Sequence, residues 1–309
     1  MAVRIIKAFY RHNPLMKIAL GKFILWQPSD FQSIEATGGI ITTFIDGNNT
    51  TWQIHTLLSS DSFFVSSVGT TGKIEYCFVA AGGGAYSGAG SLGGCSGAGG
   101  GEVIHNIGNP LPILPGTYPL IVGMGGTNAS GQIRTRGGDS GGFGITALGG
   151  GRGCQRIEEG DRDGGNGAGG AINVDLVYPD NTTAAPPGTS LSSGYTGGQA
   201  STVDPSGWVT GGGAGADESP TTPGHGGNGL ILNFDGTSRH YGGGGAGQNK
   251  AGDIFPGGLG GGGDSRQNGE DGLGGGGGAF APGTGQGGRG GSGRIMVRYP
   301  IANPPSYWL

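Results

Sequence analysis

Charge and long apolar runs are both scarce in this chain of 309 residues. Charged residues make up 12 % of the chain, and the formal net charge is −4, whereas a typical soluble domain has about 25 % charged residues. A chain with so little positive charge offers no field for a polyanion, so nucleic-acid binding is not expected. The sequence also has neither the ~20 apolar residues of a spanning helix nor the apolar core of an export signal. We therefore expect neither membrane insertion nor secretion.

Cysteine is equally rare. Cys77, Cys95 and Cys154 show no paired spacing, and an odd number cannot form a complete set of intramolecular disulfides. This usage fits folding in a reducing cytoplasm.

Glycine is the abundant residue, with 78 in the chain, and only six of them lie in residues 1–80. Long helices are excluded after residue 80, because a glycine inside a helix costs about 1 kcal/mol relative to alanine. Collagen is excluded as well, because its triple helix needs glycine at every third position and abundant proline. The chain has irregular glycine runs and only 17 prolines.

Residues 38–80 predict a small antiparallel β module. The segment is rich in Ile, Thr, Phe and Val, which favour strands, and its turn signals lie at residues 46–49 and 69–72. The side chains expected to be buried are Ile41, Phe44, Trp52, Ile54, Leu57, Phe63, Val65, Ile74 and Tyr76.

Residues 81–300 alternate glycine runs with brief apolar strands, at 114–126, 143–151, 229–234 and 293–300. A flexible linker is one interpretation. The other is a packed array of extended polyproline-II-type segments, in which the missing Cβ lets neighbouring backbones bond directly. A linker has no need of regularly spaced apolar strands, so we expect the ordered array. The fold class expected is all-β with very little helix.

Five motifs follow one another along this part of the chain. They are TWQIHTLLSSDSFFVSSVGTTGKIEYCFVAAGGGAYSGAG (51–90), GAGGGEVI (97–104), LPGTYPLIVGMGG (114–126), RGGDSGGFGITALGGGRG (136–153) and GGRGGSGRIMVRYP (287–300). In this order they resemble the glycine-rich domain of bacteriophage fibre and tail proteins, and the last resembles that family's closing strand. The resemblance covers about residues 38–300, whereas residues 1–37 match nothing in it and 171–223 form a polar insert.

The resemblance implies a virion structural protein, a fibre or tail component whose loops at one end contact the bacterial surface. Its expected partners are other virion proteins and a bacterial receptor, either a polysaccharide or an outer-membrane protein. The expected location is the virion, assembled in the host cytoplasm. The alternative is a capsid-attached head fibre or decoration protein with a mainly structural role.

The enzyme-like motifs have simpler explanations. G-x-G-x-x-G arises by chance at this glycine content, so a dinucleotide site is not expected. Residues 138–142 spell GDSGG, as around a serine-protease nucleophile, but His12, His55 and His105 lack a matching context for the base that such chemistry needs. A polysaccharide hydrolase would need a carboxylate pair in a cleft, and acids are scarce here. A secreted glycine-rich matrix or receptor ectodomain, the remaining rival, would be expected to carry an export signal and paired cysteines. No enzyme and no cofactor are expected.

No metal site is expected either. The acidic cluster at residues 158–163 does not have the spacing of a calcium loop, so a solvated loop is the preferred interpretation. His225 and His240 each stand alone between glycines and are expected to be structural or exposed.

Residues 171–209 are the best candidate for receptor binding, because Tyr178, Tyr195 and Trp208 lie there among small polar residues. Aromatic side chains supply a large contact area at a small entropic cost. An equally weighted alternative is that these rings cover the ends of the glycine array.

Residues 1–37 carry a local charge of +3 and many apolar residues for so short a segment. Exposed apolar surface usually marks an interface, so we expect this segment to dock onto the virion through Phe9, Phe23 and Trp26. The simplest assembly is a homotrimer, and the alternative is a single tip on a trimeric shaft. The expected organisation is a docking segment (1–37), a β module (38–80), a glycine-rich domain (81–300) and a C-terminal tail (301–309).

Overall fold

The computed structural model describes residues 31–85, 94–128, 135–154, 162–174, 182–184, 187–202, 209–280 and 286–308. The proposed docking residues Phe9, Phe23 and Trp26 lie outside these ranges. Contacts divide the chain between Gln32 and Ser33, and residues 33–309 form one unit. Within the described part, no helix has the length and apolar character needed to cross a bilayer.

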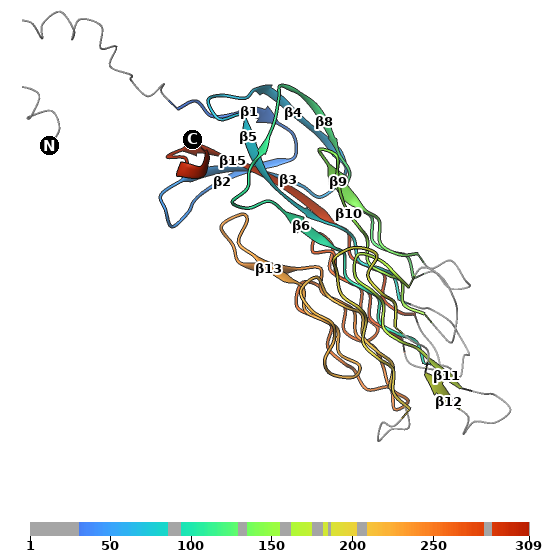
Figure 1. Cartoon of the computed structure of the whole chain (residues 1–309). Helices are drawn as coiled ribbons and strands as arrows, with labels where there is room; N and C mark the ends of the chain where they lie inside the picture. Colours follow the sequence, from blue (N-terminus) through green and yellow to red (C-terminus); the bar gives the residue numbers. More distant parts are fainter. Residues whose placement is uncertain are drawn as a thin grey trace, which may run out of the picture. The chain divides into compact units, whose positions relative to one another are not determined.

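A six-stranded antiparallel sheet carries the main core (Figure 1). Its order is β2 (Ile40–Ile45), β3 (Thr51–Leu57), β15 (Arg294–Ala302), β5 (Lys73–Val79) and β6 (Val103–His105), and β7 (Leu111–Pro112) also pairs with β5. The closing strand β15 lies between β3 and β5, where Val297 is opposite both His55 and Tyr76. The β module and the end of the glycine-rich domain thus share one sheet.

Shorter elements complete the fold. Strands β1 (Glu35–Thr37), β4 (Asp61–Ser67) and β8 (Gly116–Leu120) form a three-stranded sheet. Three hairpins follow: β9 (Ser140–Gly142) with β10 (Ile145–Ala147), β11 (Ile172–Val174) with β12 (Thr182–Ala184), and β13 (Leu230–Leu232) with β14 (Arg239–Tyr241). In the described residues the only helical turn is a 3-10 turn at Ser306–Trp308. The expected all-β class is confirmed.

The strands form because aromatic and β-branched residues fill a common interior. Trp52, Phe63, Ile74, Phe78 and Val297 belong to one buried cluster. Every side chain expected to be buried in residues 38–80 lies in or against a core cluster, apart from one.

Ile41 is the exception, and its predicted burial was wrong. The side chain is 48 % exposed, because β2 is the outermost strand of the sheet and pairs only with β3 among the described residues.

Residues 301–308 do not hang free as a tail. Strand β15 continues to Ala302, and Trp308 is buried with its ring edge-to-face against Trp52, at 5.6 Å between centroids.

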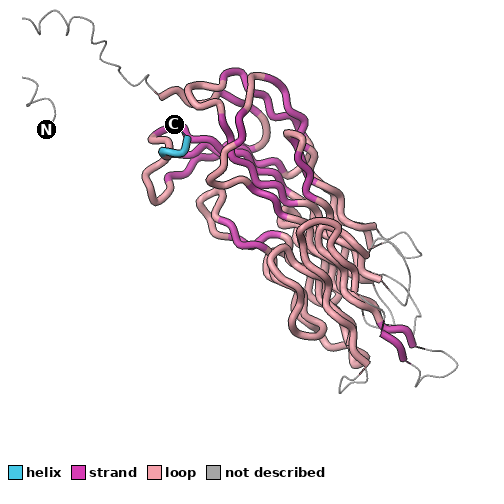
Figure 2. The backbone as a smooth tube through the Cα atoms, viewed as in Figure 1, coloured by secondary structure: helices cyan, strands magenta, loops and turns pink. Residues whose placement is uncertain are grey.

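Beyond the sheets, glycine segments run side by side with almost no regular strand (Figure 2). We call these segments the glycine lattice. Along residues 80–85, N–H groups three residues apart bond to the same neighbouring segment. Ala80 and Gly83 bond to 99–102, Ala81 and Gly84 to 135–138, and Gly82 and Ala85 to 288–291, at 2.8–3.2 Å.

The same period appears in residues 97–102. Gly97 and Gly100 bond to 211–214, Ala98 and Gly101 to 274–277, and Gly99 and Glu102 to 148–151. Three residues per turn is the period of a polyproline II helix, which leaves all of its N–H and C=O groups free to bond to neighbours. Each segment therefore bonds to several others at once.

Glycine is required because the backbones touch. A methyl group added at Gly83 would overlap the carbonyl of Gly151, and one at Gly99 would overlap that of Asn166. The obstacle is main chain in both cases, so no change of rotamer can relieve it.

Candidate functional site

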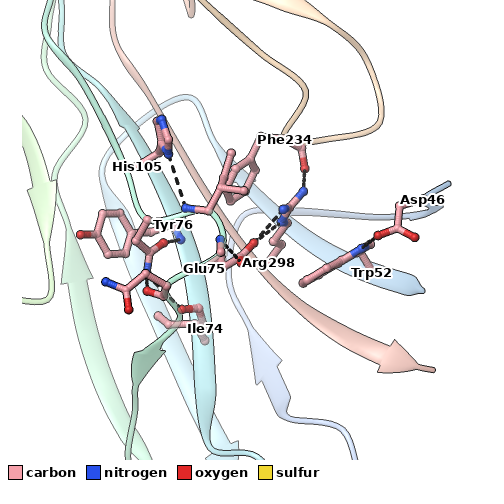
Figure 3. Close-up of polar contacts among 12 residues, drawn as sticks. Asp46, Trp52, Ile74, Glu75, Tyr76, His105, Phe234 and Arg298 are labelled. Atoms are coloured by element: carbon pink, nitrogen blue, oxygen red, sulfur yellow. Dashed lines mark hydrogen bonds and ion pairs between the residues drawn. The ribbon is translucent and has the colours of Figure 1, made fainter. Parts of the chain in front are cut away.

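Two opposite charges, Glu75 on β5 and Arg298 on β15, are buried opposite each other in the six-stranded sheet (Figure 3). Arg298 Nε donates to Glu75 Oε2 at 2.8 Å and Nη2 lies 2.7 Å from the same oxygen. The guanidinium also donates from Nη1 to the carbonyl of Phe234 at 2.8 Å, and it lies against the rings of Trp52 and Phe234. The pair joins the sheet to the segment that follows β13.

The other polar atoms of Glu75 and its neighbours are also hydrogen-bonded. Glu75 Oε1 accepts hydrogen bonds from Gly108 N–H at 2.7 Å and from the Tyr307 hydroxyl at 3.3 Å. Asp46, at the β2–β3 turn, accepts from the indole N–H of Trp52 at 2.9 Å. Saturated hydrogen bonding of this kind fixes side chains in place, so the cluster has a structural role.

Ser140, the serine of the GDSGG motif, is buried at the start of β9. Its Oγ accepts a hydrogen bond from Gly123 N–H at 2.9 Å. Of the three histidines considered as its base, His12 lies outside the described residues. His55 bonds instead to Gly38 O and the Tyr299 hydroxyl, and His105 Nδ1 accepts a hydrogen bond from Ile107 N–H at 3.4 Å. No hydrogen bond joins either of these two to the serine. His240, expected to be structural or exposed, bonds to Gly229 O.

An open apolar groove of about 930 Å³ borders the same hairpin. Leu114, Tyr118, Ile121, Phe143 and Ile145 line it. Asp139 and Ser140 also line the groove, but their side chains are bonded to Arg136 and to Gly123 N–H, so the groove does not define a ligand.

Several segments of the glycine lattice end side by side, and their described ends are bonded together. Ala80 bonds to Glu102 beside strands β5 and β6, whereas Ala85 lies five residues further along, which is about 15 Å for a polyproline II segment. We call the side at Ala85 the distal end. Described residues that border five ranges of the chain lie on this side. The ranges themselves are outside the described residues: 86–93, 129–134, 155–161, 203–208 and 281–285.

The described residues at the borders of these five ranges are bonded to one another or to a shared neighbour. The bonds are Ala85 N to Gly288 O (2.8 Å), Asn128 Nδ2 to Gly287 O (2.6 Å), Gly84 N to Thr135 O (3.2 Å), Ser96 N to Cys154 O (2.9 Å) and Thr210 Oγ1 to Cys95 O (2.7 Å). These bonds hold the described ends of the lattice segments together on the distal side.

Small polar side chains replace glycine at this end. Ser96 Oγ accepts a hydrogen bond from Cys154 N–H at 3.0 Å, and Thr135 Oγ1 accepts one from Thr127 N–H at 3.0 Å. Ser96 and Thr135 were not among the functional residues expected from the sequence. The signal was the appearance of Ser and Thr at the borders of glycine runs, where side chains cap backbone groups that have no further glycine neighbour.

Of the three proposed receptor-binding aromatics, only Tyr195 lies in the described part of the chain. Tyr195 is 39 % exposed as a residue, and its backbone is bonded into the lattice through Asn166 Oδ1 and Gly167 N–H. Tyr195 thus lies outside the five ranges bordered by the distal end. Tyr178 and Trp208 fall outside the described residues, Tyr178 between β11 and β12 and Trp208 directly before Val209, which pairs with Ser201 and Asn249.

The acidic cluster is described only at Arg162 and Asp163. Asp163 Oδ1 accepts hydrogen bonds from the backbone N–H and the hydroxyl of Thr189, at 2.6 and 2.9 Å. In the described parts of the chain, no three His, Cys, Asp or Glu side chains are grouped so as to hold a metal ion.

Comparison with known proteins gives one result. The model of the glycine-rich domain family matches residues 59–300, which is most of the chain. No curated protein matches the sequence. The chain belongs to the glycine-rich domain family.

Proposed function

We propose that this glycine-rich domain protein is a structural protein of a bacteriophage virion, a fibre or tail component that attaches the particle to its host. Its receptor would be a polysaccharide or outer-membrane protein of the bacterial surface. Residues 1–37 would dock it onto other virion proteins, most simply as a homotrimer.

The bonding of several segment ends to one another at the distal end of the lattice carries this proposal. Binding residues are often found on connections that a rigid scaffold holds in place, because connections tolerate changes that the scaffold does not. Here the scaffold is held by main-chain bonds such as Gly83 N to Gly99 O at 2.9 Å. Sequence changes in the connections would leave those bonds intact, as a receptor-binding surface under selection requires.

The proposed receptor contacts are Tyr178, Tyr195 and Trp208. In the sequence, Trp208 directly precedes Val209 and Thr210, of which Thr210 is bonded at the distal end, and Tyr178 lies between the paired strands β11 and β12. Aromatic rings stack on sugar faces and bury apolar protein surface with few rotatable bonds.

Adsorption of virions to host cells tests the proposal. We expect the triple variant Tyr178→Ala, Tyr195→Ala and Trp208→Ala to lower the adsorption rate at least about tenfold, the effect of losing about 1.4 kcal/mol. Phe64→Ala is the matched control, since Phe64 is an exposed aromatic residue on β4. Unchanged adsorption of virions that incorporate the triple variant would refute the adhesion role.

The docking role has a separate test. Residues 2–27 lie outside the unit that begins at Ser33. We therefore expect the protein without residues 2–27 to fold and yet to be missing from particles. Normal incorporation would refute docking by this segment. Labelling the chain on intact virions would then distinguish a tail position from the head-fibre alternative.

A further inference from the structure

Strand β2 forms an open edge of the six-stranded sheet (Figure 1). Its six residues, IITTFI, pair with β3 on one side, and no other strand of the described chain pairs with them. Three of its side chains are large, apolar and exposed: Ile40 (59 %), Ile41 (48 %) and Ile45 (65 %).

The turn that follows β2 shows which backbone groups face outward. Asp46 N–H donates to Thr50 O at 3.0 Å, so this pair is hydrogen-bonded. Antiparallel pairs alternate between bonded and non-bonded, and the register is continuous from Ile45–Thr51 to Ile40–Thr56. Ile41, Thr43 and Ile45 therefore stand in non-bonded positions opposite β3, and their N–H and C=O groups point away from the sheet.

Strand β2 itself, as described, lacks three of the features that usually protect an edge against pairing: charge, proline and a bulge. Natural edge strands carry charges, proline or bulges that prevent another strand from adding to them. Strand β2 has no charged residue and no proline, and its pairing with β3 shows no register shift.

We propose that β2 is an interface between two copies of this chain, which pair antiparallel about a two-fold axis at Thr43. In this register Thr43 lies opposite Thr43 of the second copy, and Ile41 lies opposite Ile45. The outward N–H and C=O groups of these three residues bond across the axis. The two sheets then continue into one another.

The sequence of the edge favours a second copy over a different partner. An isologous interface places the same patch on both subunits, and the outward series Ile41–Thr43–Ile45 reads the same from either end. Side chains two residues apart lie on one face of a strand, so each Ile41–Ile45 pair covers two exposed isoleucines. Because β2 has no charged residue, pairing two copies brings no like charges together within the strand. This two-fold contact is separate from the three-fold contacts of the homotrimer proposed above, which would be made through residues 1–37. The inference goes beyond the proposed attachment function and does not depend on it.

Cysteine cross-linking of the full-length protein tests the register. A bonded antiparallel pair has a Cα separation of about 5.5 Å, which suits a disulfide. We expect Thr43→Cys to give a covalent dimer under mild oxidation. The matched control is the neighbouring exposed residue, as Thr42→Cys: its counterpart across the axis is further away than the ~7 Å that a disulfide can span. The native Cys77, Cys95 and Cys154 are buried and do not compete.

A second variant tests the backbone bonds. Thr43→Pro removes the outward N–H at the axis while leaving the bonds to β3 intact, since proline is tolerated at such edge positions. By light scattering we expect the wild type to show a concentration-dependent doubling of mass, and Thr43→Pro to lose it with an unchanged melting temperature. The proposal fails if the association survives Thr43→Pro, if the wild type shows no doubling, or if Thr42→Cys cross-links as well as Thr43→Cys.

Discussion

The β-sheet region and the glycine lattice belong to one unit, yet side chains fill the interior of the first and main chain fills the interior of the second. In the sheets, side chains such as Phe63, Phe78 and Val297 exclude water, and main-chain bonding follows ordinary strand ladders. In the lattice the main chain is itself the interior, since Gly83 and Gly99 lie in contact with neighbouring carbonyls. One region is specified by side-chain shape and the other by the absence of side chains.

This difference predicts opposite responses to a single methyl group. A side-chain core relaxes in part around a lost methyl, because neighbouring side chains can shift. A lattice of bonded backbones cannot make room for an added methyl without breaking hydrogen bonds along several segments. Four measurements would break or sharpen the comparison.

The largest effect is expected for Gly83→Ala, because the new methyl would overlap the Gly151 carbonyl. We expect a loss of at least about 4 kcal/mol in the free energy of unfolding, at the extreme of single substitutions, measured by urea denaturation. Gly47→Ala is the control, since nothing lies near its added methyl, and it should change stability by less than about 0.5 kcal/mol. Similar losses of unfolding free energy in the two variants would show that the lattice can make room for the added methyl group.

Glu75→Gln should rank next. It leaves the Arg298 guanidinium buried without its counter-charge, and removing one partner of such a pair costs about 3 kcal/mol or more. Asp271→Asn breaks the more exposed pair with Arg289 and should cost less than about 1 kcal/mol. Equal losses in the two variants would contradict the structural role of the buried pair.

Ile74→Val removes one methyl from the side-chain core, where Ile74 is fully buried. We expect a loss of about 1 kcal/mol by the same denaturation method, because neighbouring side chains can partly fill the space. A loss as large as that of Gly83→Ala would remove the distinction between the two regions.

The smallest effect is a pH dependence in the sheet region. Burial lowers the pKa of His55, against a smaller opposing effect of its hydrogen bond to Gly38 O. The unfolded chain takes up this proton near pH 6.5 and the folded chain takes it up only at a lower pH, so this contribution to stability is complete above pH 6.5 and falls as the pH drops through it. Melting temperatures measured between pH 7.5 and 5.5 should show a shallower slope for His55→Asn than for the wild type. Burial also lowers the pKa of His105, so His105→Asn separates its contribution.

Much of the sheet region could be predicted from sequence. The apolar and β-branched residues of 51–57 and 73–79 identified strands that contain Trp52 and Ile74, both buried in the core. Ile41 was misjudged because an edge strand and a central strand share the same composition, and only the tertiary fold decides which has one neighbour. Glu75 and Arg298 each interrupt an apolar strand with a charge, which was a usable signal. Their pairing spans 223 residues and has no local signature.

In the lattice, the need for glycine follows from backbone packing, but the choice of neighbours does not. Gly83 bonds to Gly99 and Gly82 to Gly291, yet nothing in those runs of identical residues distinguishes one partner from another. The distal end was therefore visible only in the structure. The aromatic candidates came from composition alone, and Tyr195 shows the limit of that reasoning, because its backbone is part of the lattice.

The position of β15 has a consequence for the synthesis of the protein. Strands β3 and β5 are made early, but the strand that joins them begins at Arg294, 215 residues after Val79. At about 5–20 residues per second, a ribosome needs roughly 10–40 s to cover that distance. Throughout that time the two strands lack their native central partner, and unpaired strands invite association between nascent chains. Folding dominated by contacts this distant in sequence is slow, so completion of the sheet is a late event that follows translation of nearly the whole chain.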